Sequence, residues 1–344
     1  NKVSMSYASE LTKRFEAEIS REYLGLEKPV NKITPLVSVS VITYNQKNYI
    51  RQCLEGILMQ QVNFPMEIVI GDDGSSDGTT EICKEYADRF PDKIRLFIRD
   101  RNTSHYYENG KYIWFFNGHW SRMSCKGKYV AICEGDDYWI DPLKLQKQVD
   151  FLEKNPDYSL CFTNARVLAE GKLSKIHLNI YAGLETREYT GEEILKKWTI
   201  PTASVLYRNN NVPIVSDNRF VYEDIIIFLV LAQMGRIYCI NEHTAVYRRG
   251  VGLTFTDKVD YKRRINHYLA IKEHFGEKYD RVLKTLIAKA YVIDFVSGKL
   301  GKKSFSILWE VITQPKYLLP FLAYLPVHIY YILYDKVFIL RNRK

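Results

Sequence analysis

The chain has 344 residues, 46% of them apolar and 26% charged, which are the proportions of a globular protein and exclude a disordered or fibrous one. Its formal net charge of +9 is modest for this length and does not by itself indicate a nucleic-acid partner. The six cysteines form no CxxC pair, so the sequence predicts neither a disulfide framework nor a zinc site and favours a reducing compartment.

Residues 1–35 are polar and carry no apolar run of the length that a secretory signal needs, and a helix is expected from Ser9 to Tyr23. A regular pattern of strands and helices begins at Leu36. Strands are expected at 37–42, 67–70, 94–98 and 129–133, and helices at 49–60, 79–90, 113–125 and 141–153. The last of these helices is expected to start with Asp141 as cap and Pro142 as first residue.

This alternation predicts an α/β fold with a doubly wound, mainly parallel sheet, whose ligands bind beyond the carboxyl ends of the strands. Further along the chain, strands are expected at 158–168, 203–207 and 236–247, and helices at 224–233 and 257–297. The chain is expected to divide into four parts: an N-terminal helical extension (1–35), the α/β domain (36–255), a basic helical segment (256–303) and an apolar tail (304–344).

The first acidic cluster, Asp72–Asp73–Gly74–Ser75–Ser76–Asp77, follows the second expected strand. Gly74 permits a tight turn, and a carboxylate there can accept hydrogen bonds from a nucleobase or a ribose. The alternative is an Asx turn in which Asp77 merely caps the next helix.

The second cluster, Glu134–Gly135–Asp136–Asp137, follows the fourth expected strand directly. Its carboxylates repel one another unless a cation neutralises them. Oxygen ligands of this kind suit Mg²⁺ or Mn²⁺, which often bridge protein carboxylates to substrate phosphates. The alternative is a solvated acidic turn, but the position at the end of a buried strand favours a metal site.

The third cluster is Glu223–Asp224, at the start of the apolar helix expected over 224–233. A carboxylate held there and partly desolvated could act as a general base, because desolvation raises its pKa toward neutrality. The alternative is an acid that only complements the dipole of the helix.

Three segments in this order and spacing resemble the family-2 glycosyltransferases, which have the GT-A fold. They are residues 39–45 (VSVITYN), 72–79 (DDGSSDGT) and 127–139 (GKYVAICEGDDYW). The resemblance extends from Leu36 to Gly252. It implies a mixed, mainly parallel sheet flanked by helices, and a nucleoside-diphosphate sugar as donor.

The resemblance also implies roles for individual residues. Asp224 would be the catalytic base of an inverting reaction, Asp136 and Glu134 would bind Mg²⁺ or Mn²⁺, and Asp73, or alternatively Asp72, would hold the base, expected to be uracil. Residues implied to contact the nucleotide or the donor sugar are Thr43, Tyr44, Asn45, Asp72, Asp73, Asp137, Arg248 and Arg249. Residues expected near the acceptor are Glu223, Thr202 and Ser204.

The chain departs from the family pattern at two places. The metal signature begins with Glu134 where aspartate is commoner, and Tyr247–Arg248–Arg249–Gly250 lacks the histidine of the family's Tyr-Arg-x-His segment. Arg248 or Arg249 would then neutralise the diphosphate.

The expected function is therefore metal-dependent, inverting transfer of a hexose from a nucleoside-diphosphate sugar to a hydroxyl of a glycan or lipid-linked acceptor, as in polysaccharide biosynthesis. Two alternatives are a sugar nucleotidyltransferase, disfavoured because no Gly-rich loop follows the first strand, and a non-catalytic module that binds nucleotide sugars or membranes. No nucleic-acid partner is expected, because the acidic clusters have no interleaved basic and aromatic residues around them.

The tail predicts contact with a membrane. Tyr317–Tyr334 has no formally charged residue, is rich in tyrosine, and is flanked by lysine and arginine. It is slightly short for a span, and Pro320 and Pro326 are expected to interrupt it. We expect helices lying on an anionic leaflet, and so a cytoplasmic protein peripheral to the inner face of the cell membrane. The alternatives are a helix pair, in the core or between two copies of the chain, and a true span.

Overall fold

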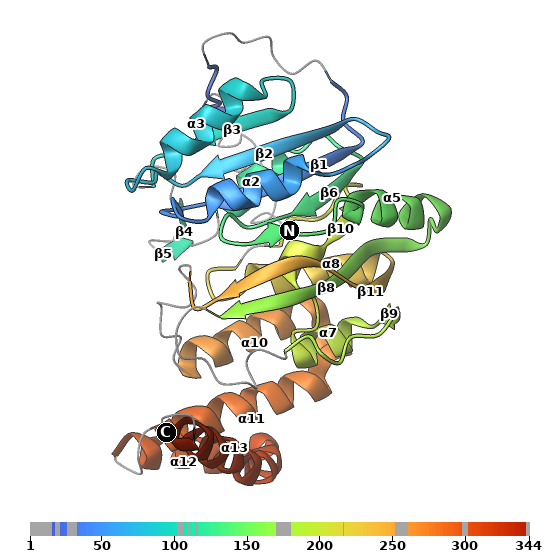
Figure 1. Cartoon of the computed structure of the whole chain (residues 1–344). Helices are drawn as coiled ribbons and strands as arrows, with labels where there is room; N and C mark the ends of the chain where they lie inside the picture. Colours follow the sequence, from blue (N-terminus) through green and yellow to red (C-terminus); the bar gives the residue numbers. More distant parts are fainter. Residues whose placement is uncertain are drawn as a thin grey trace.

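The structure is a computed structural model that describes residues 16–17, 21–25, 33–101, 106–108, 111–113, 116–169, 180–215, 217–251, 261–297 and 302–341. Its centre is a mixed sheet in the strand order β3-β2-β1-β6-β10-β8-β11-β7, with β9 paired to β11 (Figure 1). The strands of this sheet are β1 (Val37–Thr43), β2 (Met66–Asp72), β3 (Ile94–Ile98), β6 (Tyr129–Ile132), β7 (Tyr138–Trp139), β8 (Tyr158–Ala169), β9 (Arg187–Tyr189), β10 (Leu206–Arg208) and β11 (Arg236–Arg249). Two further strands, β4 (Tyr106–Glu108) and β5 (Lys111–Ile113), form a separate hairpin.

The expected fold class is confirmed. Strands β3, β2, β1 and β6 are successively parallel, β10 is antiparallel to both β6 and β8, and β8 is parallel to β11. Every residue of β2 is buried, because a central parallel strand is covered on both faces. The helices that accompany the sheet are α2 (Ile50–Leu58), α3 (Thr79–Arg89), α4 (Phe116–Met123), α5 (Lys144–Lys154), α7 (Gly191–Lys197) and α8 (Glu223–Met234).

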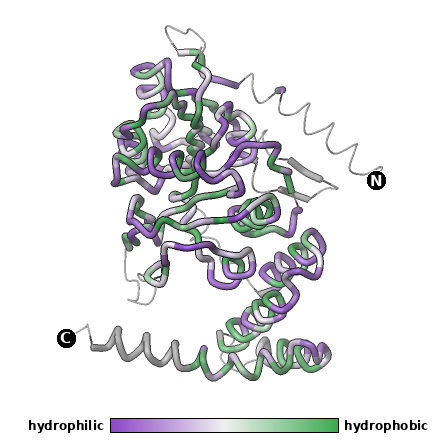
Figure 2. The backbone as a smooth tube through the Cα atoms, turned by 90° about the vertical axis from the view of Figure 1, so that its right-hand side faces the viewer, coloured by the Kyte–Doolittle hydropathy of each residue, from purple (hydrophilic) through white to green (hydrophobic). Residues whose placement is uncertain are grey.

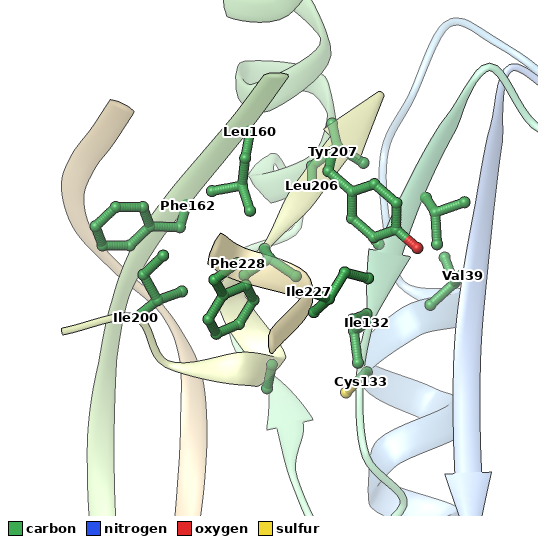
Figure 3. Packing of buried hydrophobic residues seen from close by; sticks show 14 of the residues in the cluster. Val39, Ile132, Cys133, Leu160, Phe162, Ile200, Leu206, Tyr207, Ile227 and Phe228 are labelled. Carbon is green, nitrogen blue, oxygen red and sulfur yellow. The ribbon is translucent and has the colours of Figure 1, made fainter. Parts of the chain in front are cut away.

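The middle of helix α8 is buried, from Ile225 to Leu231. A helix that is apolar on all sides belongs inside a protein. Figure 3 shows Ile227 and Phe228 of this helix among side chains of the sheet, including Leu206 and Ile132. The packing fixes the helix, and with it Glu223 and Asp224 at its N-terminus.

Several expected element boundaries are wrong. The strand expected at 203–207 is a 3₁₀ turn, η1 (Thr202–Ser204), followed by the short β10. The helix expected from Asp141 begins three residues later at Lys144, because the Asp141 carboxylate accepts a hydrogen bond from the Leu143 amide and pairs with Lys147.

The helix expected from Ser9 to Tyr23 lies mostly outside the described residues. The part that is described at its end is extended: Tyr23 N donates to Leu96 O at 2.7 Å and Ile98 N donates to Arg21 O at 3.3 Å. This segment therefore adds to the edge of the sheet beside β3.

The C-terminal helices lie beyond β8 and β11 at one end of the molecule (Figures 1 and 2). They are α10 (Tyr261–Phe275), the 3₁₀ helix η2 (Gly276–Tyr279), α11 (Asp280–Ser297), α12 (Lys302–Thr313) and α13 (Pro315–Arg341). They have a hydrophobic core of their own, which includes Tyr291, Ile307 and Phe321.

Pro320 and Pro326 do not interrupt the tail, contrary to expectation, because α13 runs through both. Tyr317 and Phe321 flank Pro320 and are buried in the second core, and this packing holds the helix on each side of the missing amide. Among the described residues, no helix reaches the length and apolarity needed to cross a bilayer.

Candidate active site

The loops after β1, β2 and β6 meet at one edge of the sheet, as parallel strands require. Thr43 at the end of β1 pairs in register with Asp72 at the end of β2. Asp73 N donates to Thr43 O at 3.0 Å, and Gly135 N donates to Ile42 O at 2.9 Å. Two of the three predicted acidic clusters are thus joined through the end of β1.

The structure distinguishes Asp72 from Asp73. Asp72 is fully buried, and its carboxylate accepts hydrogen bonds from the Ser75 hydroxyl at 2.5 Å and from the Thr80 hydroxyl. Both of its carboxylate oxygens are engaged in holding the turn. Asp73 is partly exposed and pairs with Arg101 at 2.7 Å. The Arg101 guanidinium lies 4.0 Å from the centre of the Tyr44 ring.

The loop after β1 is tied to the turn after β2. Asn45 has a left-handed backbone (φ 50°), its amide donates to Ser75 Oγ at 2.9 Å, and its side-chain oxygen accepts from Ser76 N at 2.8 Å. Thr43 Oγ1 donates to Gln46 Oε1 at 2.8 Å. Thr43, Tyr44 and Asn45 therefore form one wall with the turn that carries Asp73.

Asp77 forms the Asx turn that the sequence analysis gave as the alternative to ligand binding. Its Oδ1 accepts hydrogen bonds from the amide of Thr79 at 3.0 Å and from the hydroxyl of that residue at 2.6 Å. Its Oδ2 accepts from Lys47 N at 3.0 Å. The side chain forms an Asx turn just before α3, whose N-cap residue is Gly78, and both of its oxygens are engaged.

The turn after β6 is pressed against the loop after β1. A Cβ on Gly135 would approach Gln46 Oε1 to 2.5 Å and Thr43 Oγ1 to 2.9 Å, so only glycine fits there. Asp137 N donates to Glu134 O at 2.9 Å and closes the turn. The carboxylates of this turn are held beside the wall formed by Thr43 to Asn45.

Burial and mutual repulsion raise the pKa values of these carboxyl groups. The pKa of Glu134 rises to about 8, first because of burial and then because of the negative charges of Asp136, Asp224 and Glu223. Burial also raises the pKa of Asp136, and that of Asp137 rises well above its usual range. Within the described residues, no hydrogen-bond partner reaches Asp137 Oδ2. When ionised, these carboxylates carry negative charge that Arg248 offsets only in part, at Asp136.

This charge suits a divalent cation whose ligands come partly from a substrate. Among the described residues, no group of three or more acids, histidines or cysteines is placed to hold a metal ion. Mg²⁺ and similar ions are commonly bound by one or two carboxylates together with substrate phosphates, not by a cage made entirely of protein. Asp136 and Glu134 fit that donor set.

Arg248 packs against the acidic turn that follows β6. Its guanidinium is buried between the rings of Tyr49 and Tyr138, at 4.9 and 4.6 Å from their centres, and bonds Asp136 O and Gln52 Oε1. Its amide donates to Asp137 Oδ1 at 2.8 Å. This residue positions the acidic turn.

Arg249 is more exposed than Arg248. Burial raises the pKa values of Tyr181 and Tyr247, and the positive charge of Arg249 offsets part of that rise. The nearby acids reinforce that rise, Asp137 for both tyrosines and Asp224 for Tyr181. Sequence reasoning did not identify Tyr181, because no motif marks it, and it noted Tyr247 only as the first residue of the segment Tyr247–Gly250.

Asp224 lies in the first turn of α8. Its Oδ1 accepts from Ile225 N at 2.8 Å and its Oδ2 from Thr202 Oγ1 at 3.0 Å. Burial raises the pKa of Asp224 to about 6, and the Thr202 hydrogen bond opposes that rise. The charge of Asp224 contributes to the raised pKa of Glu134, so the second and third acidic clusters lie within electrostatic reach of each other.

Glu223 has the opposite environment. It pairs with Arg122 at 2.7 Å and with His119 at 2.8 Å. These charges outweigh burial and lower the pKa of Glu223 to about 2. The pair His119 and Arg122 is a second set of residues that sequence reasoning missed. Their spacing of three residues on α4 puts both on one helix face, but it does not reveal the partner.

Thr202 and Ser204 have different roles. Thr202 holds the Asp224 carboxylate, as described above. Ser204 is fully buried, and its hydroxyl donates to Pro201 O at 2.7 Å inside the 3₁₀ turn. Glu223 lines a cavity of about 120 Å³ together with His119, Arg122 and Tyr207. Of the three residues expected near the acceptor, Thr202 is the one in direct contact with Asp224.

The chain is similar to known glycosyltransferases in sequence and in fold. Residues 38–119 match the family model described as Glycosyl transferase family 2. An uncharacterized protein of Mycobacterium tuberculosis is 35% identical over 215 residues, which are 62% of this chain and 58% of that protein. The match thus spans less than two thirds of that relative.

A second relative and one solved structure extend the comparison. TuaG of Bacillus subtilis, provisionally named as a glycosyltransferase of teichuronic acid biosynthesis, is 28% identical over 217 residues, 62% of this chain and 79% of TuaG. The crystal structure of S. aureus TarS in complex with UDP-GlcNAc has a TM-score of 0.54 at 17% identity, covering 83% of this chain and 79% of that chain. The folds are alike.

Proposed function

We propose that this chain, which belongs to glycosyl transferase family 2 and has the GT-A fold, transfers a sugar from a nucleoside-diphosphate sugar to an acceptor hydroxyl with inversion of the anomeric carbon. The observation that carries the proposal is the desolvated carboxylate of Asp224, whose charge raises the pKa of Glu134 in the acidic turn Glu134–Asp137. The acidic turn would hold a cation next to the leaving diphosphate, and Asp224 would act as the base.

The donor nucleotide would bind along the wall formed by the loops after β1 and β2. Tyr44 offers an aromatic face and Asp73 a carboxylate beside it, both in contact with Arg101. An aromatic ring and a hydrogen-bond acceptor are what recognition of a nucleobase requires. We propose uracil as the base, as in the UDP-GlcNAc bound by TarS.

Asp136 and Glu134 would hold Mg²⁺ or Mn²⁺, with Arg249 as a further cationic group for the diphosphate. When bound, such a cation stabilises negative charge that develops on the leaving group. The raised pKa values of Glu134 and Asp136 support this role, because a cation relieves the repulsion that causes part of the rise at Glu134. Asp137 would contact the donor sugar.

Asp224 would act as the general base. Its pKa of about 6 leaves it ionised at neutral pH and still basic enough to accept a proton. One Asp224 oxygen takes the proton of the acceptor hydroxyl, the acceptor oxygen forms a bond to the anomeric carbon, and the bond from that carbon to the diphosphate oxygen breaks. Thr202 keeps the carboxylate oriented through its 3.0 Å hydrogen bond.

For the acceptor we propose a glycan or lipid-linked saccharide of polysaccharide biosynthesis, the process that the name of TuaG also refers to. We further propose that the C-terminal helices bring the enzyme to the inner, cytoplasmic face of the cell membrane. Three of their apolar side chains are strongly exposed: Trp309 (70%), Leu319 (77%) and Leu322 (52%). Exposed apolar side chains near basic residues favour an anionic lipid surface.

The function can be tested with a panel of nucleoside diphosphates and their sugar conjugates, with and without Mn²⁺, measured by calorimetry and by product formation. We expect Asp224→Asn to reduce transfer by about 10² to 10⁴ while nucleotide affinity stays unchanged. Asp136→Ala should instead weaken Mn²⁺-dependent nucleotide binding at least tenfold. Glu242→Gln removes an exposed carboxylate that pairs with Lys147 and should leave both unchanged.

Near-normal transfer in Asp224→Asn would remove Asp224 from the role of base. Release of pyrophosphate from a nucleoside triphosphate and a sugar phosphate would instead identify a nucleotidyltransferase. Nucleotide-sugar binding without transfer to any glycan or lipid-linked acceptor would identify a binding module.

A further inference from the structure

Helix α7 brings an aromatic ring to the helix that carries Asp224. A capping box starts α7, in which Thr190 Oγ1 accepts from Glu193 N at 3.2 Å and Glu193 Oε2 accepts from Thr190 N at 2.9 Å. A Cβ on Gly191 would lie 3.2 Å from the Cβ of Ala232, so the start of α7 packs on the end of α8. At its other end, α7 stops at Trp198.

The backbone of Trp198 has an unusual conformation for its residue type. It is left-handed (φ 50°, ψ 58°), and its amide donates to Ile194 O at 3.0 Å to close the helix. Glycine or asparagine normally occupies this position at a helix end, because a larger side chain is strained there. The tryptophan side chain therefore does not stabilise the turn. Residues with a strained backbone are concentrated at functional sites.

The Trp198 ring stands beside the segment that leads into α8. Its centre is 4.6 Å from that of the Tyr222 ring, the two planes are at 77°, and 38% of Trp198 is exposed. Tyr222 directly precedes Glu223, and the charge of Asp224 reaches the Tyr222 hydroxyl. Four residues after Trp198, Thr202 binds the Asp224 carboxylate. The exposed Trp198 ring is thus connected to Asp224 through Tyr222 and through the segment that leads to Thr202.

We propose that Trp198, held in a T-shaped contact with the Tyr222 ring, is the platform on which a pyranose ring of the acceptor stacks, so that the acceptor is a saccharide and not a bare polyol or lipid alcohol. A pyranose has an apolar face of C–H groups, which packs on the negative face of an aromatic ring. Its hydroxyls stay free for hydrogen bonds, and one of them would reach Asp224. The proposal rests on the proposed function, because it takes Asp224 as the base.

The test uses the full chain with UDP and diamagnetic Mg²⁺, and methyl glucopyranoside, methyl glucuronopyranoside and glycerol as probes. Saturation-transfer NMR reports which probe protons touch the protein. We expect signals on the ring C–H protons of the pyranosides and weak signals from glycerol. Trp198→Phe should keep the pyranoside signals, whereas Trp198→Gly should weaken pyranoside binding at least tenfold.

Trp198→Gly is chosen because glycine suits the left-handed backbone, so loss of the ring is separated from loss of the turn. Its melting temperature should stay within a few degrees of that of the parent chain. Met234→Ala is the matched control, because Met234 is exposed to a similar degree (41%) at the far end of α8. It should keep the pyranoside signals.

Unchanged pyranoside binding in Trp198→Gly, or equal signals from glycerol and the pyranosides, would overturn the platform. Calorimetry with UDP and Mn²⁺ on the parent chain keeps this outcome apart from failure of the proposed function. If the parent chain binds UDP and only the effect of Trp198→Gly is missing, the platform alone is wrong. Absence of nucleotide binding would overturn the function itself.

Discussion

Glu223 and Asp224 are adjacent in the chain, yet the structure shifts their pKa values in opposite directions. Both carboxyl groups are buried, which raises a pKa, but Glu223 is paired with Arg122 and His119 and ends at about 2. Asp224 has only neutral hydrogen-bond donors and ends at about 6. Glu223 is therefore held ionised by its cationic partners, whereas Asp224 can accept a proton. A general base requires this second property.

Asp224 should lower the stability of the folded protein at neutral pH. Its pKa rises from 3.8 unfolded to about 6 folded, so the folded state holds the proton more tightly. The free energy of unfolding then falls as the pH rises through this window, by about 3 kcal/mol, since one pKa unit corresponds to about 1.4 kcal/mol. Asp224→Asn, without nucleotide or metal, should therefore melt several degrees higher than the parent chain at pH 7 and close to it at pH 4.

The matched control for this measurement is Asp217→Asn, because the pKa of Asp217 is shifted the other way. Arg219 and His274 bind that carboxylate and lower its pKa to about 2. Its stabilising contribution is present above the unfolded pKa and is lost as the pH falls toward 2. Asp217→Asn should therefore melt lower than the parent chain at pH 7. A difference for Asp224→Asn that does not change with pH would contradict desolvation as the cause.

The acids of the site could be predicted from sequence because each follows a strand or starts a helix, and position along the chain fixed their place. Their partners could not be predicted. Arg122 and Glu223 are separated by 101 positions, and only the packing of α4 near α8 brings them together. Asp72 and Asp73 differ in role because alternate residues at a strand end point to opposite sides, which local sequence does not distinguish.

At the scale of elements, the α/β part was largely predictable and the C-terminal part was not. Strands β1, β2, β3 and β6 are mostly apolar segments, and this pattern identifies them in the sequence. β10 is short and follows a 3₁₀ turn, because Pro201 and Ser204 close that turn with a hydrogen bond. The prolines of α13 predicted a break, but tertiary packing on the second core overrides local preference there.

We expect the packing of the second core to have little effect on nucleotide binding. Phe321 of α13 is fully buried, and its ring meets that of Phe295 edge-on at 5.6 Å. Phe321→Ala should destabilise the packing of α11 and α13 by about 3–5 kcal/mol, because it leaves a cavity. Hydrogen exchange should then speed up in α13, while the affinity for UDP and Mn²⁺ measured by calorimetry stays within about twofold.

Leu319→Ala is the control on the same helix, because Leu319 is 77% exposed and its removal leaves no cavity. It should leave both hydrogen exchange and nucleotide affinity unchanged. A large loss of nucleotide affinity in Phe321→Ala would show that the C-terminal helices form part of the nucleotide site, and the boundary between the α/β domain and the helical region would then be misplaced.

At the scale of the whole molecule, the charge of +9 and the exposed apolar side chains of the C-terminal helices favour the same partner. An anionic membrane attracts basic residues and takes up apolar side chains at its interface. Part of the tail, including Tyr317 and Phe321, is buried against α11, so removing the tail would uncover a core. A point substitution at an exposed position is the cleaner test.

We expect the full chain to float with vesicles of phosphatidylglycerol and phosphatidylcholine, and less with phosphatidylcholine alone. Leu319→Glu should reduce flotation about tenfold or more, because inserting one leucine contributes about 1.5–3 kcal/mol and the new charge repels the lipid. Met234→Glu, at a similarly apolar exposed position (41%) on α8, should float like the parent chain. High salt should weaken binding by screening the basic residues. If the chain stays in the soluble fraction and sediments as a dimer that Leu319→Glu dissociates, the exposed face pairs two copies of the chain and does not bind lipid.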